Sequence, residues 1–187
     1  MKKSNVLVGT VTMFENGNLA VDGVPYTADE KIMARLEKVK PLGKGILFDL
    51  NEDGSIKNFS FNGFRTMEEK AVSQTGEEYT RYIKVIYGTL VNPRVFTDKN
   101  GNDNISFSIP VDIRVKQEDG TYADETRWNN CVIWASTGHV EEAKPVFIAE
   151  SEKKPSVWVT AIGRTTETEE GVKQTTYSVI EYGIINR

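Results

Sequence analysis

The sequence predicts an all-β protein with short helices, and three observations support this fold class. Most apolar residues alternate with polar ones or form short β-rich runs. Helical spacing of apolar residues is confined to two segments. Gly-containing turns separate the β-type runs, and glycine supplies the positive φ angles that tight hairpins need. These turns lie at Asn16-Gly17, Asp53-Gly54, Asn100-Gly101, Asp119-Gly120 and Glu170-Gly171.

In the first half, strands are expected at residues 6–13, 19–22, 44–50 and 55–61. One helix interrupts them. The run Thr27-Ala28-Asp29-Glu30 has a capping-box pattern, in which an N-cap residue precedes an acid by three positions. Apolar residues follow at helical spacing, namely Ile32, Met33, Leu36 and Val39. Pro41 and Gly43 end the helix.

The second half repeats this logic. Val85-Ile86-Tyr87-Gly88-Thr89-Leu90 is similar to Val6-Leu7-Val8-Gly9-Thr10-Val11. A helix is expected at 140–149, after the third strand, and two more strands at 156–163 and 173–184. Five strands with one helix after the third is the order of the OB barrel.

The predicted organisation has three parts. Residues 81–187 form an OB-type five-stranded barrel. Residues 1–65 form a smaller β-rich domain, which is either OB-like or a divergent β-domain. The polar segment 66–80, which contains Gly76, is a linker or an exposed hairpin.

Composition limits the function classes. Hydrophobic residues make up 39% of the 187 residues, and the net charge is −4. Neither half is a basic module, which disfavours nucleic acid, although a basic groove can lie on an acidic protein. A single cysteine forms no intrachain disulfide. Because no stretch approaches the ~18 apolar residues of a membrane span, we expect a soluble, cytoplasmic protein with no membrane partner.

The most informative segment is the strand from Thr126 to Trp134. Side chains alternate along a strand, so Trp128, Asn130, Val132 and Trp134 share one face. The opposite face, with Cys131, Ile133 and Ala135, is compact and apolar and suits the core. Two exposed indoles need a reason. Either nucleic-acid bases stack on them, or they are buried in a second sheet layer or a subunit interface.

From Tyr87 onward, the chain resembles the bacterial-type single-stranded DNA-binding proteins. The motifs of that family stand here in order as Gly88-Thr89-Leu90, Asn92-Pro93, Asn100-Gly101, Phe107-Ser108-Ile109 and Glu125-Thr126-Arg127-Trp128, with Trp134 six residues later. The resemblance implies an OB barrel on which Trp128 and Trp134 stack bases. It also implies a homo-oligomer, dimer or tetramer, since members combine four barrels.

The chain departs from the family in several places. Val115 stands where members often carry a further stacking tryptophan, and Asn130 where a basic residue is common. The chain stops right after its last strand, so recruitment through an acidic C-terminal tail is not expected. The extra N-terminal half is foreign to the common layout, and such rearranged members are plausible in phages and mobile elements of a bacterial host.

Further residues can serve the same face. Arg94, Arg114, Lys116 and Arg127 are placed to meet phosphates, or they form a solvated hairpin edge that protects the strand. Tyr87 and Phe96 are candidate extra platforms for bases.

No enzyme is expected, and no cofactor or metal. His139 is the only histidine, and no zinc-ligand set or nucleophile–base motif accompanies it. The leading function is sequence-tolerant binding of single-stranded DNA, with RNA as the alternative ligand, during replication or recombination. The alternative function is an OB-fold interaction or structural protein whose tryptophans lie in a subunit interface.

Overall fold

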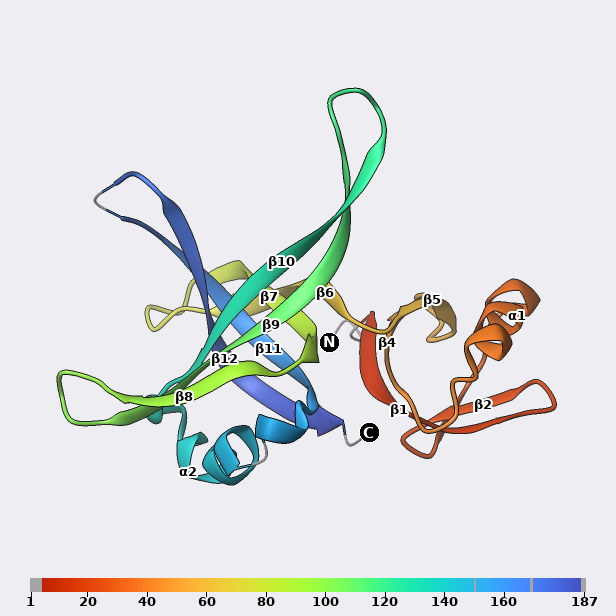
Figure 1. Cartoon of the computed structure of the whole chain (residues 1–187), viewed down its shortest axis with the longest axis horizontal. Coiled ribbons are helices and arrows are strands. Elements are labelled where there is room, and N and C mark those ends of the chain that lie inside the picture. Colours follow the sequence, from red (N-terminus) through yellow and green to blue (C-terminus); the bar gives the residue numbers. More distant parts are fainter. Residues whose placement is uncertain (1–4, 150, 169, 186–187) are drawn as a thin grey trace.

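The computed structural model describes residues 5–149, 151–168 and 170–185, whose strands form two sheets (Figure 1). The smaller sheet has the order β3-β2-β1-β4-β5, and the larger has the order β6-β7-β11-β12-β10-β9-β8. The first half contains β1 (Val6–Glu15), β2 (Asn18–Val21), β3 (Val24–Tyr26), α1 (Glu30–Val39), β4 (Gly45–Leu50) and β5 (Ile56–Ser60). The rest contains β6 (Gly63–Val72), β7 (Glu78–Thr89), β8 (Val91–Thr97), β9 (Asp103–Lys116), β10 (Tyr122–Ile133), η1 (Ala135–Thr137), α2 (Val140–Lys144), η2 (Pro145–Ala149), η3 (Ser151–Lys153), β11 (Ser156–Glu167) and β12 (Lys173–Ile185).

The larger sheet closes into an OB barrel. β7 and β8 stand near opposite ends of the row, yet only Leu90 separates them in the chain, so they act as one bent strand. β10 and β12 pair in parallel and the other pairs are antiparallel. With α2 between the third and fourth barrel strands, this is the OB order. The OB barrel predicted for the C-terminal half is therefore confirmed.

When β7 and β8 are counted as one strand, the barrel strands lie in the order third, second, first, fourth, fifth. The smaller sheet has this same order, with α1 between its third and fourth strands. Just after β3, Ala28 forms a parallel bridge with Ile56 of β5. The Ile56 N–H also donates to the Thr27 carbonyl at 2.8 Å. This bridge corresponds to the parallel β10–β12 contact. The first half is therefore OB-like in its strand order, and we call it the first barrel and the C-terminal OB barrel the second barrel.

The two similar sequence runs occupy equivalent places. Gly9 pairs with Ile46, the second residue of β4, and Gly88 pairs with Val157, the second residue of β11. A Cβ at Gly9 would lie 2.5 Å from Val21 Cγ1, and one at Gly88 would lie 2.9 Å from Ile109 Cγ2. In each barrel, glycine lets the first strand cross closely over the second.

Segment 66–80 lies within the β6–β7 hairpin. β6 pairs with β7 from Gly63↔Tyr87 to Val72↔Glu78, which adds β6 to the edge of the larger sheet. In the turn, Gly76 has a φ of +86° and its N–H donates to the Ser73 carbonyl. Glycine is favoured there because that φ is left-handed. Where the chain divides into domains remains a prediction.

Both helices differ in detail from the sequence-based expectation. The N-cap of α1 is Asp29, whose carboxylate accepts from the Ile32 N–H at 2.7 Å. Thr27 does not take this place because the neighbouring bridge keeps the chain extended there. The α-helical part of 140–149 ends at Lys144, and the remainder, from Pro145, is a π-helical turn. Proline lacks the N–H that regular helical bonding would use.

A hydrophobic cluster joins the two barrels. Leu47 of β4 packs with Val85 and Tyr87 of β7 and with Ile185 of β12. The contact is close, because a Cβ at Gly45 would lie 2.5 Å from the Tyr87 hydroxyl oxygen. The Arg65 side chain adds hydrogen bonds of 2.7 and 3.1 Å to the Asp49 carboxylate across the same contact. Each barrel also has its own core. Within the described part of the chain, no helix is long and apolar enough to cross a membrane.

Candidate nucleic-acid interface

Strands β8, β9 and β10 present one outer face, which is defined by their pairing. Directly opposed side chains in an antiparallel pair lie on the same side of the sheet. Trp128 opposes Pro110 and Asn130 opposes Ser108. The alternate residues on these strands, such as Ile109, Cys131 and Ile133, are buried in the barrel core. The outer face comprises Arg94, Phe96, Ser106, Ser108, Pro110, Asp112, Arg114, Lys116, Tyr122, Asp124, Thr126, Trp128, Asn130 and Val132.

Trp128 lies in the middle of this face and is 57% exposed. The indole points away from the core because its chain neighbours, Arg127 and Asn129, lie on the other side of β10. The Asn129 side-chain amide donates to the Ile109 carbonyl at 3.0 Å. A large aromatic ring left in solvent on a regular sheet provides a flat surface on which a base can stack.

Trp134 follows β10 directly and is half-buried. Its Nε1–H donates to the Ser178 hydroxyl of β12 at 3.0 Å, and Phe96 meets the indole edge-to-face at 6.0 Å between ring centroids. Trp134 and Phe96 therefore form an aromatic pair at the opposite end of the face from the β9–β10 turn. Six residues of extended chain place the two tryptophans about 20 Å apart, at ~3.3 Å per residue.

Two of the residues that the sequence suggested lie elsewhere. Tyr87 is only 2% exposed, because the first barrel covers the part of β7 from which its side chain projects. It cannot serve as a platform for bases. Arg127 belongs to the opposite side of β10 from Trp128, since neighbouring side chains alternate. Its guanidinium carbon lies 5.8 Å from the centroid of the Phe64 ring.

The cations of the outer face differ in their surroundings. Arg94 donates from Nε to the Ser106 hydroxyl at 3.1 Å, and it forms no ion pair within residues 5–149, 151–168 and 170–185. Arg114 lies 3.4 Å from the Asp124 carboxylate, with both side chains largely exposed. Lys116 opposes Tyr122 near the tip of the projecting β9–β10 hairpin (Figure 1). Among the described residues, the charges of Arg94 and Lys116 are therefore not paired with a carboxylate, whereas that of Arg114 is.

The polar residue Asn130 is held in place by its neighbour. Its side-chain oxygen accepts from the Ser108 hydroxyl at 2.9 Å, which leaves the exposed amide NH₂ facing outward on the same surface as Trp128. An amide can donate to phosphate or to base edges without carrying charge. Asn130 therefore extends the polar part of the face beside the exposed indole.

Cys131 and His139 are the remaining residues whose side chains could carry chemistry. Burial raises the pKa of the Cys131 thiol, so it stays protonated. The Nδ1 of His139 lies 3.8 Å from the Glu142 carboxylate one turn away, and its ring packs edge-to-face against Tyr182. Among the described residues, no group of three or more His, Cys, Asp or Glu side chains is arranged to hold a metal ion.

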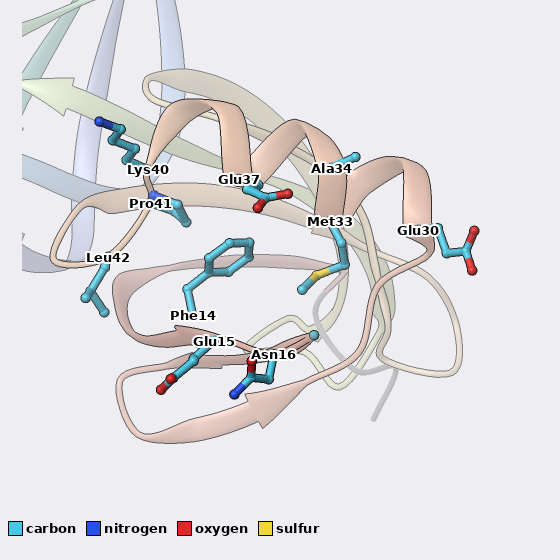
Figure 2. Close-up of a pocket in the computed structure, with 11 residues that line it drawn as sticks. Phe14, Glu15, Asn16, Glu30, Met33, Ala34, Glu37, Lys40, Pro41 and Leu42 are labelled. Atoms are coloured by element: carbon cyan, nitrogen blue, oxygen red, sulfur yellow. The ribbon is translucent and has the colours of Figure 1, made fainter.

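A separate hollow of about 740 Å³ lies in the first barrel, between α1 and the β1–β2 hairpin (Figure 2). Its floor includes Phe14 and Met33, and its edge carries Glu15, Glu30 and Glu37 with one cation, Lys40. This excess of carboxylates repels phosphate. The hollow is therefore a poor place for a nucleic-acid backbone.

The comparisons with known proteins find a likeness in structure alone. No family model and no curated protein sequence matches the chain. The similar solved structures include a Plasmodium falciparum SSB in complex with ssDNA, with a TM-score of 0.43 and 13% identity over 64% of this chain and all of that one. They also include the Saccharomyces cerevisiae mitochondrial single-stranded DNA-binding protein Rim1, with a TM-score of 0.38 and 18% identity over 55% of this chain and 94% of that one. A small single-stranded DNA-binding protein from Streptomyces coelicolor has a TM-score of 0.36 and 13% identity over 55% of this chain and 90% of that one.

Proposed function

We propose that this protein binds single-stranded DNA without strong sequence preference and without catalysis, on the outer face of its second barrel. The observation that carries the proposal is the exposure of Trp128 on the face that the second and third strands of an OB barrel share. OB barrels bind oligonucleotides on the face of these two strands. Stacking of bases on aromatic rings is tolerant of sequence because every base has a π-face.

The aromatic residues, the cations and Asn130 each have a role in this proposal. One base stacks on Trp128, and another packs against the pair formed by Trp134 and Phe96. Arg94 meets phosphate, with Arg114 and Lys116 nearer the hairpin tip, and Asn130 donates from its amide. The biological role that fits is protection of exposed strands in replication or recombination. A homo-oligomer, dimer or tetramer, would combine several such faces on one strand.

Replacing Arg94 by Gln is expected to reduce the salt dependence of binding. Loss of one phosphate contact lowers the slope of log K against log salt by ~0.7 for a single strand. The measurement is fluorescence anisotropy of labelled oligo-dT at several salt concentrations. Arg114→Gln is the matched control. It should change the slope less, because Asp124 already lies 3.4 Å from that guanidinium.

The same titration separates the alternatives. Equal slopes for the wild type and Arg94→Gln would remove Arg94 from the site. Absence of binding to oligo-dT at low salt, with folded protein, would favour the other function, in which a protein partner or a second copy covers Trp128. Parallel titrations with oligo-U compare RNA with DNA, since the same stacking and phosphate contacts serve both.

A further inference from the structure

A second hollow, of about 520 Å³, lies where the two barrels meet. The second barrel contributes Tyr87 of β7 and Ser156 of β11, while the first barrel contributes Phe61 and the segment from Gly43 to Gly45. The hollow is open to solvent at Phe61, whose ring is 44% exposed. Two barrels thus form one recess, and its exposed aromatic ring comes from the barrel that carries no part of the outer face.

This recess adjoins the outer face. Side chains at alternate positions of the bent β7–β8 strand, from Tyr87 through Thr89 to Val91, project from the outer side of the barrel. Val91 opposes Ser108, which in turn opposes Asn130. Asn62, which directly follows Phe61, makes a second connection. Its side-chain amide nitrogen lies 3.4 Å from the Asp112 carboxylate on the outer face. Phe61 therefore lies beside the surface that carries Trp128.

The recess has the two chemical features that a nucleotide requires. The Lys44 ammonium lies 5.6 Å from the centroid of the Phe61 ring. It is held by donation to the Val39 carbonyl at 2.6 Å, and within the described residues it forms no ion pair. Its charge is therefore not cancelled by a carboxylate. Phe61 is fixed by an edge-to-face contact with Phe59 at 6.3 Å.

We propose that Phe61 and Lys44 of the first barrel bind a further nucleotide of the same single strand, so that the strand runs from the outer face across the junction of the two barrels. This inference rests on the proposed function. Phe61 supplies a ring for a base and Lys44 a cation for the adjoining phosphate. The first barrel thereby lengthens the binding site, in addition to packing against the second.

The test compares oligonucleotides of two lengths. OB barrels occupy roughly 4–16 nucleotides each, so labelled oligo-dT of about 8 and about 20 nucleotides distinguishes one barrel from both. Phe61→Ala is expected to weaken binding of the long oligonucleotide about tenfold, the effect of losing one stacked base. It should leave the short one, which the outer face binds alone, nearly unchanged. Lys44→Gln should weaken the long one and lower its salt slope.

Matched variants keep the outcome interpretable. Tyr79→Ala removes a ring of similar exposure, 48%, from the remote β6–β7 hairpin and should change neither affinity. Phe61→Leu keeps apolar volume next to Phe59 while removing the ring, and should weaken the long oligonucleotide as Phe61→Ala does. If both Phe61 variants bind the long oligonucleotide like the wild type while Trp128→Ala does not, this inference is wrong and the proposed function stands. If the wild-type protein binds neither length, the proposed function itself fails.

Discussion

Replacing Trp128 and Trp134 together by alanine is expected to weaken binding of oligo-dT by about a hundredfold or more. Each stacked base contributes ~1–3 kcal/mol, and 1.4 kcal/mol corresponds to about tenfold in affinity. Trp128 should provide the cleaner single variant, because its ring is 57% exposed and its removal leaves the core intact. The measurement is equilibrium binding of labelled oligo-dT, with thermal unfolding of each variant recorded alongside.

Trp134 needs a control for its structural contacts. Its alanine variant also loses the Ser178 hydrogen bond and the contact with Phe96. Trp134→Phe lacks the indole N–H and has a smaller ring system, but it keeps an aromatic ring at the site, so it should retain more affinity than Trp134→Ala. Undiminished affinity in the double alanine variant would exclude stacking on these two rings.

Replacing Phe147 by alanine is expected to cost about 3–5 kcal/mol of the free energy of unfolding, as for other buried phenylalanines. Phe147 lies in η2 after α2 and is fully buried in the core of the second barrel. Its ring packs between Phe107 at 4.8 Å and Tyr182 at 5.2 Å. Loss of the ring leaves a cavity between these two aromatic neighbours. Urea denaturation of the wild type and variant measures the difference.

Val146→Ala, at a partly buried neighbouring position in the same turn, is the control for general damage to η2. It should destabilise the protein by roughly 1 kcal/mol, a typical value for a point substitution. If Phe147→Ala were no more destabilising than Val146→Ala, the segment from Val140 to Ala149 would not seal the barrel core as described.

Local patterns in the sequence predicted most of the second barrel. Alternation placed Cys131 and Ile133 inward and Trp128 outward, and the structure has this arrangement. The similarity between Val6–Val11 and Val85–Leu90 indicated equivalent strands, which both sheets contain. The same alternation sets Arg127 apart from Trp128, so its place on the other side of β10 was predictable from the sequence.

Contacts between distant segments could not be predicted in this way. Tyr87 projects outward from β7, as a platform for bases would require, but β4 of the first barrel covers it. The polar residues of segment 66–80 left a linker and an exposed hairpin both open, and the structure shows β6 paired with β7. The sequence predicted Phe61 as the last residue of the strand at 55–61. Its exposure results from the chain leaving β5 at Ser60.

The central claim, that bases stack on the tryptophans of the outer face, is tested most directly by intrinsic tryptophan fluorescence during titration with oligo-dT at low and high salt. The Trp158→Phe variant removes the third indole, which packs between the barrels and would contribute a constant background. We expect strong quenching that weakens as salt rises, because bases then cover Trp128 and Trp134 while cations meet phosphates. Unchanged fluorescence at low salt, with folded protein, would contradict the account and would assign the exposed indole to a protein interface.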